Sequence, residues 1–306
     1  MKKELLIIIM FLLVNTACGQ QFTDSDLDYF GQNPPGDSAV IFAPGIFSLP
    51  DRLESRITFS QDGKEIYFEV IEIENNKVSN KIYYTQYLNN SWTEQVEVPF
   101  STNNNVGKPY LSADGERLFF TKDGDIWMIE RAGQGWSEPQ PLPSPINSTS
   151  TESSYMETAD GVAYISSKRP GGFGGIDNWR INRLSDQSLQ AENLGSILNS
   201  TSFDFSPFIA PDGSYLIFGS DRNGRSGRAH LYISFNKGND EWTAPINMNS
   251  SGAEVNNETA NHNSPIISPD GKFLFFVRHE TINVMDVYWV NANIIDKLRE
   301  ESGLTP

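Results

Sequence analysis

A short turn recurs five times along the chain and constrains the fold more than any other feature. Each copy ends in Asp-Gly, and the glycines of successive copies stand 52, 46, 52 and 58 residues apart. Because an apolar or aromatic stretch flanks each turn on both sides, each copy predicts a β-hairpin. The chain is therefore expected to be an array of one small β unit. The five turns are Ser60–Gly63, Ser112–Gly115, Thr158–Gly161, Ala210–Gly213 and Ser268–Gly271.

The repeat length predicts a β-propeller. Propeller blades hold four strands in roughly 40 to 50 residues, and such repeats stand in a ring. In the second repeat the strands are expected at 108–112, 117–121, 125–131 and 140–143. Outer strands follow a tryptophan and a small hydroxyl residue, and these tryptophans are expected to pack within the blades. The alternative is that the three tryptophans form a binding platform for a carbohydrate. They are Trp92, Trp136 and Trp242.

The two ends of the array complement each other. The fifth unit runs out after its third strand, near Ile295, and so lacks an outer strand. Residues 40–47 near the other end resemble the outer strands and are expected to complete the last blade, which leaves no unpaired sheet edge. The fold prediction is an all-β propeller of five four-stranded blades over 38–295, with six blades less favoured. Residues 296–306 are expected to be a polar tail or a short helix.

The first residues read as an export signal. An apolar run follows two lysines within residues 1–17; it is too short for a bilayer span of about 20 residues but suits a secretory signal. Cys18, the only cysteine, resembles the lipidation site of bacterial lipoproteins, although Asn15 stands where leucine is usual. A plain secretory signal is the alternative. Residues 18–37 are expected to form a tether, and one cysteine permits no internal disulfide.

The charge of the chain narrows its partners. The formal net charge is −16, which argues against nucleic acid and anionic membrane surfaces, because both are bound through Lys and Arg. The acidic excess keeps an exported protein dispersed. The expected partner is an envelope protein or a glycan, with membrane contact through the lipid anchor only. The expected location is the bacterial cell envelope, at the periplasmic face or the outer membrane.

The repeats resemble a known family. Ser-Pro-Asp-Gly turns followed by aromatic strands, together with the segment 167–177 (Ser-Lys-Arg-Pro-Gly-Gly-Phe-Gly-Gly-Ile-Asp), look like the TolB-type, WD40-like propeller with Pro-Asp repeats. The resemblance covers 40–295, although the Pro-Asp pair itself stands only at 211–212 and 269–270. It implies the fold, an envelope setting and a binding or scaffolding role. It implies little about chemistry, since propellers host many unrelated functions.

Propeller geometry indicates where a site is expected. The Asp-Gly turns lie on one face of the ring. The starts of the innermost strands and the loops after the second strands lie on the other face, around the channel. Functional residues are expected on this second face. Ionisable residues recur eight and six positions before the turn aspartate and in those loops. They can bind a sugar, a peptide terminus or a cation, or else pair with one another and hold the blades in register. The candidate ligand-binding residues are Glu54, Arg56, Lys108, Glu152, Arg169, Asp204, Arg222, His262, Arg278 and His279.

Two classes of function follow. The preferred one is a non-catalytic binding or scaffolding propeller that engages its partner through the channel rim, because no nucleophile or zinc motif of recognised order is present. The alternative is a glycan-active hydrolase, which needs two carboxyl groups about 5 to 5.5 Å or about 6.5 to 9.5 Å apart. Its candidate carboxylates are Glu54, Glu152 and Asp204.

No cofactor is expected from the motifs. The glycine-rich segment 170–175 lies between strands and opens no helix, so it lacks the context of a phosphate-binding loop. The five turn aspartates are dispersed around the ring, whereas a calcium ion needs several oxygens at one point. No metal residues are therefore assigned, and a single cation in the central channel is the one metal considered.

Overall fold

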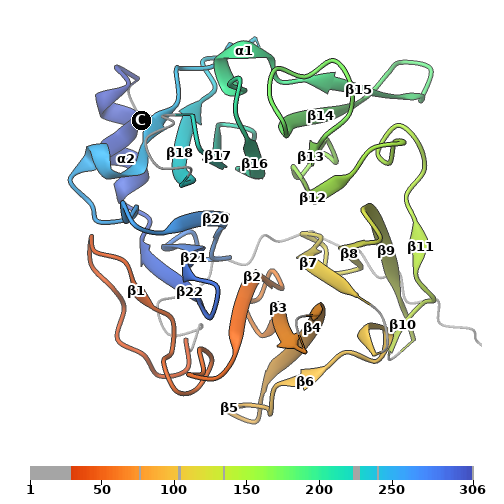
Figure 1. The fold of residues 1–306 in the computed structure, drawn as a ribbon, viewed down its shortest axis with the longest axis vertical. Coiled ribbons are helices and arrows are strands. Elements are labelled where there is room, and N and C mark those ends of the chain that lie inside the picture. Colours follow the sequence, from red (N-terminus) through yellow and green to blue (C-terminus); the bar gives the residue numbers. More distant parts are fainter. Residues whose placement is uncertain are drawn as a thin grey trace, which may run out of the picture.

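Five antiparallel sheets stand in a ring, which confirms the predicted five-bladed β-propeller (Figure 1). The computed structural model describes residues 29–304, apart from 76, 103–104, 134, 223–227 and 240. The expected signal peptide 1–17, Cys18 and the first part of the expected tether lie outside the described residues. No helix in the described ranges has the length and apolar character that crossing a membrane requires.

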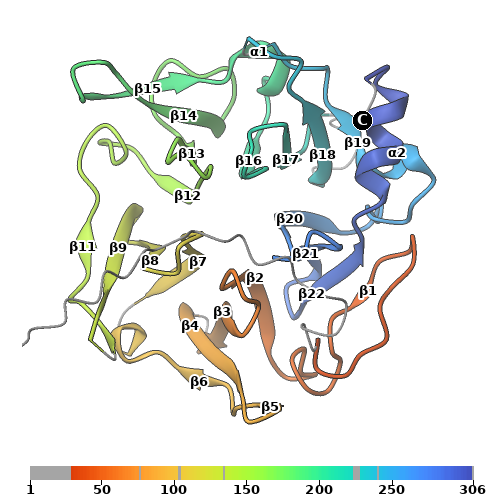
Figure 2. The same cartoon turned by 180° about the vertical axis from the view of Figure 1, so that it is seen from behind.

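Each blade runs outward from an innermost strand beside the central axis, as both views show (Figures 1 and 2). Blade 1 contains β2 (Leu53–Phe59), β3 (Glu65–Glu74), β4 (Lys77–Leu88), β5 (Ser91–Trp92) and β6 (Val96–Glu97). Blade 2 contains β7 (Val106–Leu111), β8 (Arg117–Lys122), β9 (Asp125–Ala132), β10 (Gly135–Trp136) and β11 (Gln140–Pro141). Blade 3 contains β12 (Glu152–Glu157), β13 (Ala163–Ser167), β14 (Asp177–Arg183) and β15 (Leu189–Asn193). Blade 4 contains β16 (Asp204–Ile209), β17 (Tyr215–Ser220), β18 (His230–Phe235) and β19 (Ile246–Asn247).

Blade 5 is built from both ends of the chain. Its first three strands are β20 (Asn261–Ile267), β21 (Phe273–Thr281) and β22 (Val284–Asn291), and its outer strand is β1 (Val40–Ile41). The antiparallel pairing sets Val40 opposite Trp289. The predicted closure is therefore confirmed, with two paired residues in place of the eight expected.

Four short helices complete the described structure. They are η1 (Pro99–Ser101), α1 (Gly195–Leu198), η2 (Met248–Ser251) and α2 (Ile294–Glu301). The helix α2 follows the last strand of blade 5 and buries Leu298. It begins two residues before the segment 296–306, for which a polar tail or a short helix is expected, and extends into that segment as far as Glu301.

The Asp-Gly turns are held by their own side chains. In the first turn Ser60 donates its hydroxyl to Asp62 over 2.6 Å, and the same carboxylate oxygen accepts the amide of Lys64 over 3.1 Å. Gly63 follows with φ +66°, a region that glycine enters without steric cost. The repeated aspartate thus closes its own hairpin, as its sequence context indicates.

An aromatic cluster seals the junction between the last blade and the first. Phe42 directly follows β1 and is fully buried. Its ring centroid lies 5.0 Å from that of Phe275, 5.3 Å from Trp289 and 5.1 Å from Phe47. Burying one phenylalanine side chain contributes about 1.5 to 3 kcal/mol. The short β1 is therefore held in place by the aromatic residue beside it more than by its backbone pairing.

Replacing Phe42 with alanine tests this closure. The lost burial and the remaining cavity are expected to lower the free energy of unfolding by about 3 to 5 kcal/mol, as measured by urea denaturation. Val40→Ala is the matched control, because Val40 is 41% exposed and its truncation is expected to cost less than about 0.5 kcal/mol. Equal losses in the two variants would contradict the assignment of the closure to Phe42.

Candidate ligand-binding site in the central channel

Each innermost strand carries a break in register at the same point. In β7 the shift lies between Gly107 and Tyr110, and the other four innermost strands have one at the corresponding place. At three of these breaks a non-glycine residue takes a positive φ: +51° at Lys108, +52° at Ser206 and +52° at Ser264. Because a β-bulge re-aims side chains, the break affects which side chains of each innermost strand face the channel.

The ionisable residues at the start of the innermost strands are fully buried and bind the preceding loop. Glu152 accepts the amide of Ser148 over 3.1 Å and its hydroxyl over 2.7 Å. Asp204 accepts the same two groups of Ser200. Glu54 accepts the amide of Leu49 over 3.1 Å. Each side chain therefore fixes the loop that leads into its own blade.

The predicted arginines complete these anchors. Arg169 donates to Glu152 over 3.0 Å and to the carbonyls of Pro145 and Ile146. Arg222 donates to Asp204 over 2.8 Å. In blade 1 the same role falls to Arg52, which donates to Glu54 over 2.6 Å; sequence reasoning missed this residue.

In blade 5 a histidine, His262, takes the place of the carboxylate. His262 is fully buried, and its Nε2 accepts the amide of Asn257 over 3.1 Å. Arg278 donates to the carbonyl of Val255 over 2.9 Å, and its guanidinium lies 4.1 Å from the ring centre of Tyr288. His279 is half-buried on β21, opposite Asn261. Of the two interpretations of the repeated charges, pairing within the protein is the one these contacts support.

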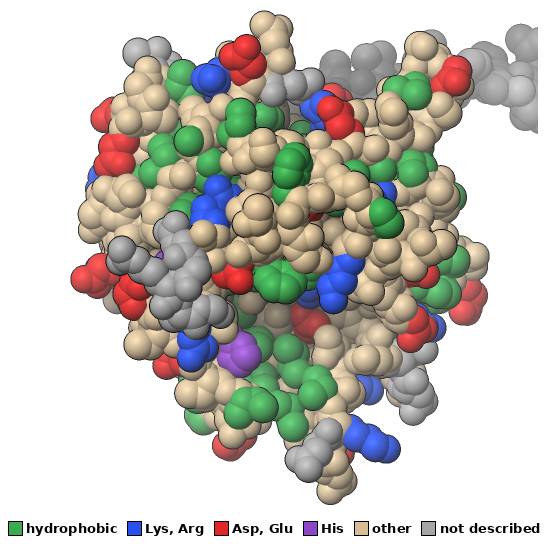
Figure 3. Space-filling model, turned by 45° about the horizontal axis from the view of Figure 1, so that its top comes forward, with side chains coloured by type: hydrophobic (Ala, Val, Ile, Leu, Met, Phe, Trp, Pro, Cys, Tyr) green, Lys and Arg blue, Asp and Glu red, His purple; other side chains and the backbone are tan. Residues whose placement is uncertain are grey.

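A charged group lies in the polar half of the channel. Arg56 is 2% exposed and donates to the carbonyl of Tyr155 over 3.3 Å. Glu69 on β3 is buried beside it and accepts Asn80 over 2.8 Å. Burial raises the pKa of Glu69, and the positive charges of Lys108 and Arg56 both act on this carboxylate and oppose the rise. Burial also lowers the pKa of Lys108. In Figure 3 acidic and basic side chains meet in a recess of the face in view.

The apolar half of the channel forms a cavity of about 600 Å³. All five blades line it, and the Asp-Gly turns form its rim. Its walls come from the ends of the innermost strands, and none of the ten predicted site residues takes part. The open end of this channel therefore lies on the turn face, whereas the sequence argument expected function on the opposite face. The wall residues are Phe59, Tyr110, Met156, Phe208 and Ile266, among others.

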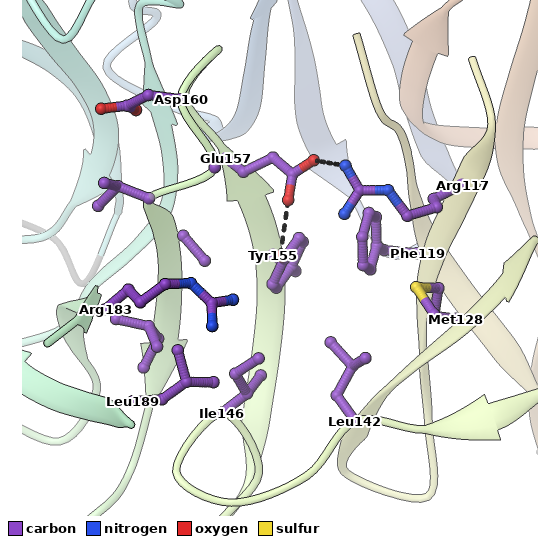
Figure 4. Close-up of a pocket in the computed structure, with 14 residues that line it drawn as sticks. Arg117, Phe119, Met128, Leu142, Ile146, Tyr155, Glu157, Asp160, Arg183 and Leu189 are labelled. Carbon is purple, nitrogen blue, oxygen red and sulfur yellow. Dashed lines mark hydrogen bonds and ion pairs between the residues drawn. The ribbon is translucent and has the colours of Figure 1, made fainter. Parts of the chain in front are cut away.

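A second cavity of about 300 Å³ lies between blades 2 and 3 (Figure 4). Glu157 lines both this cavity and the channel. Its carboxylate accepts Arg117 over 2.8 Å and the hydroxyl of Tyr155 over 2.9 Å. Burial raises the pKa of Glu157, and the charge of Arg117 opposes this.

Sequence reasoning missed Glu69 and Glu157, yet the repeat contains a signal for both. Three positions before the turn aspartate, four blades have an apolar residue and blade 3 alone has Glu157. Seven positions after it, blade 1 alone has a charged residue, Glu69. At each of these two positions, one blade has a charged residue and the other four have an uncharged one.

The carboxylates proposed for hydrolysis do not face the channel cavity. Glu54, Glu152 and Asp204 are at most 1% exposed and are absent from its lining. Burial raises the pKa of Glu54 to about 7, and its hydrogen bonds to Arg52 and to the amide of Leu49 oppose this rise. Within the described ranges, no group of three or more His, Cys, Asp or Glu residues is placed to hold a metal ion.

Comparisons with known proteins support the fold. No family model and no curated protein sequence matches the chain. The catalytic domain of GH62 α-L-arabinofuranosidase from Coprinopsis cinerea aligns over 83% of this chain and 97% of its own, at 10% identity and a TM-score of 0.52. TolB from Acinetobacter baumannii aligns over 78% of this chain and 54% of its own, so this chain spans about half of that TolB, at 15% identity and a TM-score of 0.45. The TolB structure from Agrobacterium tumefaciens aligns over 78% of this chain and 77% of its own, at 17% identity and a TM-score of 0.48.

These similarities concern architecture alone. The arabinofuranosidase shares the fold at an identity too low to carry its activity to this chain. Solved TolB structures are among the matches.

The arginine anchors can be tested by their effect on stability. Arg169→Met leaves the buried Glu152 carboxylate without its cation, so the free energy of unfolding is expected to fall by about 3 to 5 kcal/mol in urea denaturation. Lys237→Met is the control, because the side chains of Lys237 and Glu241 are 42% and 73% exposed and such pairs contribute about 0 to 1 kcal/mol. If Arg169→Met unfolds like the wild type, Arg169 is free for a ligand after all.

The histidine anchor predicts a pH dependence. Burial lowers the pKa of His262 to about 3, with repulsion from Arg278 and His230 adding to it. An unfolded histidine gains its proton near pH 6.5, so the stability from neutral His262 is complete above that pH and is lost as the pH falls toward 3. Between pH 7.5 and 4.5 the wild type is expected to lose about 2 to 3 kcal/mol more than His262→Gln. If the free energy of unfolding, measured by urea denaturation, falls by the same amount in the two proteins between these pH values, His262 titrates normally.

Proposed function

We propose that the protein is a non-catalytic binding propeller of the bacterial cell envelope that captures an apolar segment of a partner protein in the mouth of its central channel. The observation that carries this proposal is the cavity of about 600 Å³ that all five blades line. Its size lies within the range of about 300 to 1,000 Å³ that is typical of ligand sites. Five chain segments that converge on one cavity create a surface that no single blade has.

The walls of the cavity favour an apolar side chain over a sugar. Tyr110, Met156 and Phe208 line it, and the phenol of Tyr110 already donates to the carbonyl of Glu157 over 3.1 Å. Burying apolar surface contributes about 25 cal/mol per Å², and methionine adapts its shape to different occupants. A glycan would present hydroxyl groups to walls with few free polar partners. We therefore place the protein partner before the glycan.

The proposal includes the cellular location of the protein. A signal peptide at 1–17 and lipidation of Cys18 would put the ring on a tether. Tyr29 donates its hydroxyl to Asp270 over 3.0 Å, so the described chain joins the ring at the turn face of blade 5. Ten residues lie between Cys18 and Tyr29, so this part of the chain can span at most about 40 Å. A lipid anchor would then hold the channel mouth near the membrane, where a membrane-bound partner can reach it.

Charges placed on the rim test the channel mouth. Ala113 and Ala159 are exposed and line the cavity. The double variant Ala113→Glu/Ala159→Glu is expected to fold normally and to lose its partner in a pull-down from detergent-solubilised envelope, because carboxylates at the mouth repel an apolar segment. Wild-type protein is expected to recover one partner, identified by mass spectrometry.

The matched control is Ala132→Glu, which adds the same charge on exposed β9 outside the channel lining. It is expected to recover the partner as the wild type does. Equal recovery by the double variant would exclude the mouth. The same samples are assayed against envelope glycans, and glycan hydrolysis by the wild type would favour the hydrolase alternative.

A further inference from the structure

The cavity between blades 2 and 3 has an apolar floor and charged side chains at its edge (Figure 4). Phe119, Met128, Leu142, Ile146 and Leu189 line the floor. Its volume, about 300 Å³, lies at the small end of ligand sites. The molecule that fits is therefore small and has an apolar body. Its polar end is determined by whichever charged group at the edge lacks a partner.

Three of the four charged groups at the edge are already paired. Arg117 donates to Glu157 over 2.8 Å, and its guanidinium lies 5.4 Å from the ring centre of Phe119. The other oxygen of Glu157 accepts the hydroxyl of Tyr155. Asp160 accepts the hydroxyl of Thr158, and Figure 4 shows its carboxyl group turned away from Arg183.

Arg183 is the group without a charged partner. It ends β14 and is exposed. Its one described hydrogen bond runs from Nη1 to the carbonyl of Gln187 over 3.3 Å. No carboxylate in the described part of the chain pairs with it, although a guanidinium has five N–H donors. In Figure 4 this guanidinium extends into the cavity, toward Tyr155.

We propose that this cavity binds a small organic carboxylate, with the carboxylate on Arg183 and the apolar body on the floor formed by Met128, Leu142 and Leu189. The guanidinium fork matches the two oxygens of a carboxylate. A dianion such as phosphate fits less well, because it would meet the Glu157 carboxylate and leave the apolar floor uncovered. The site shares only Glu157 with the lining of the channel cavity, and Arg183 belongs to this site alone, so its failure and that of the proposed function are distinguishable.

Calorimetric titration of the mature protein with sodium hexanoate tests the proposal, with hexanamide as the neutral probe of the same shape. Hexanoate is expected to bind at least about tenfold more tightly than hexanamide, because a hydrogen bond to a charged group contributes about 1.5 to 3 kcal/mol. Arg183→Gln is expected to remove this preference. Since Arg183 is exposed, the variant is expected to unfold at the same temperature as the wild type.

Arg180→Gln is the control on the same strand. Residues an odd number of positions apart point to opposite faces of a strand, and Arg180 is paired with Glu192 over 2.8 Å. This variant is expected to bind hexanoate as the wild type does. The proposal is overturned if the wild type binds no hexanoate at millimolar concentration. Equal affinity for hexanamide, or an unchanged affinity in Arg183→Gln, overturns it as well.

Discussion

The pairing of β1 with β22 joins the two ends of the chain, and the channel depends on it. A propeller blade buries its faces only against its neighbours, so a ring that opens between blades 5 and 1 exposes two apolar faces at once. The pairing itself comprises two residues, Val40 and Ile41. Phe42 supplies the burial that so short a strand cannot. Because the channel is bounded by all five innermost strands, its width is fixed only while the ring is closed.

The sequence predicts the fold well because a blade is a local unit. The spacing of the Asp-Gly turns sets the number of blades, and the missing outer strand after Ile295 indicates where the ring closes. The site is another matter. Glu152 and Asp204 recur at one position, and the sequence left two interpretations open for them, a ligand-binding rim or pairing within the protein. In the structure Arg169 and Arg222 neutralise them inside the blade.

The cavities could not be predicted from the sequence, because they arise between blades. Tyr110, Met156 and Phe208 are more than forty residues apart in sequence and meet only in the closed ring. The bulge at the middle of each innermost strand decides which side chains reach the channel, and no residue type specifies such a shift in register. At this position blade 2 has Lys108 and three other blades have serine, and of these residues Lys108, Ser206 and Ser264 take a positive φ.

Residues that recur in every blade and residues that occur in one blade have different roles in this propeller. A residue that recurs in every blade serves something that every blade needs, such as a closed turn or a fixed loop, and its hydrogen-bonding groups are used for that purpose. A ligand of one shape breaks the fivefold pattern, so its contacts require residues that differ between blades. Glu157 stands where the other four blades have an apolar residue. The ionisable groups that depart from the repeat, more than those that follow it, are therefore where the chemistry of this propeller is to be sought.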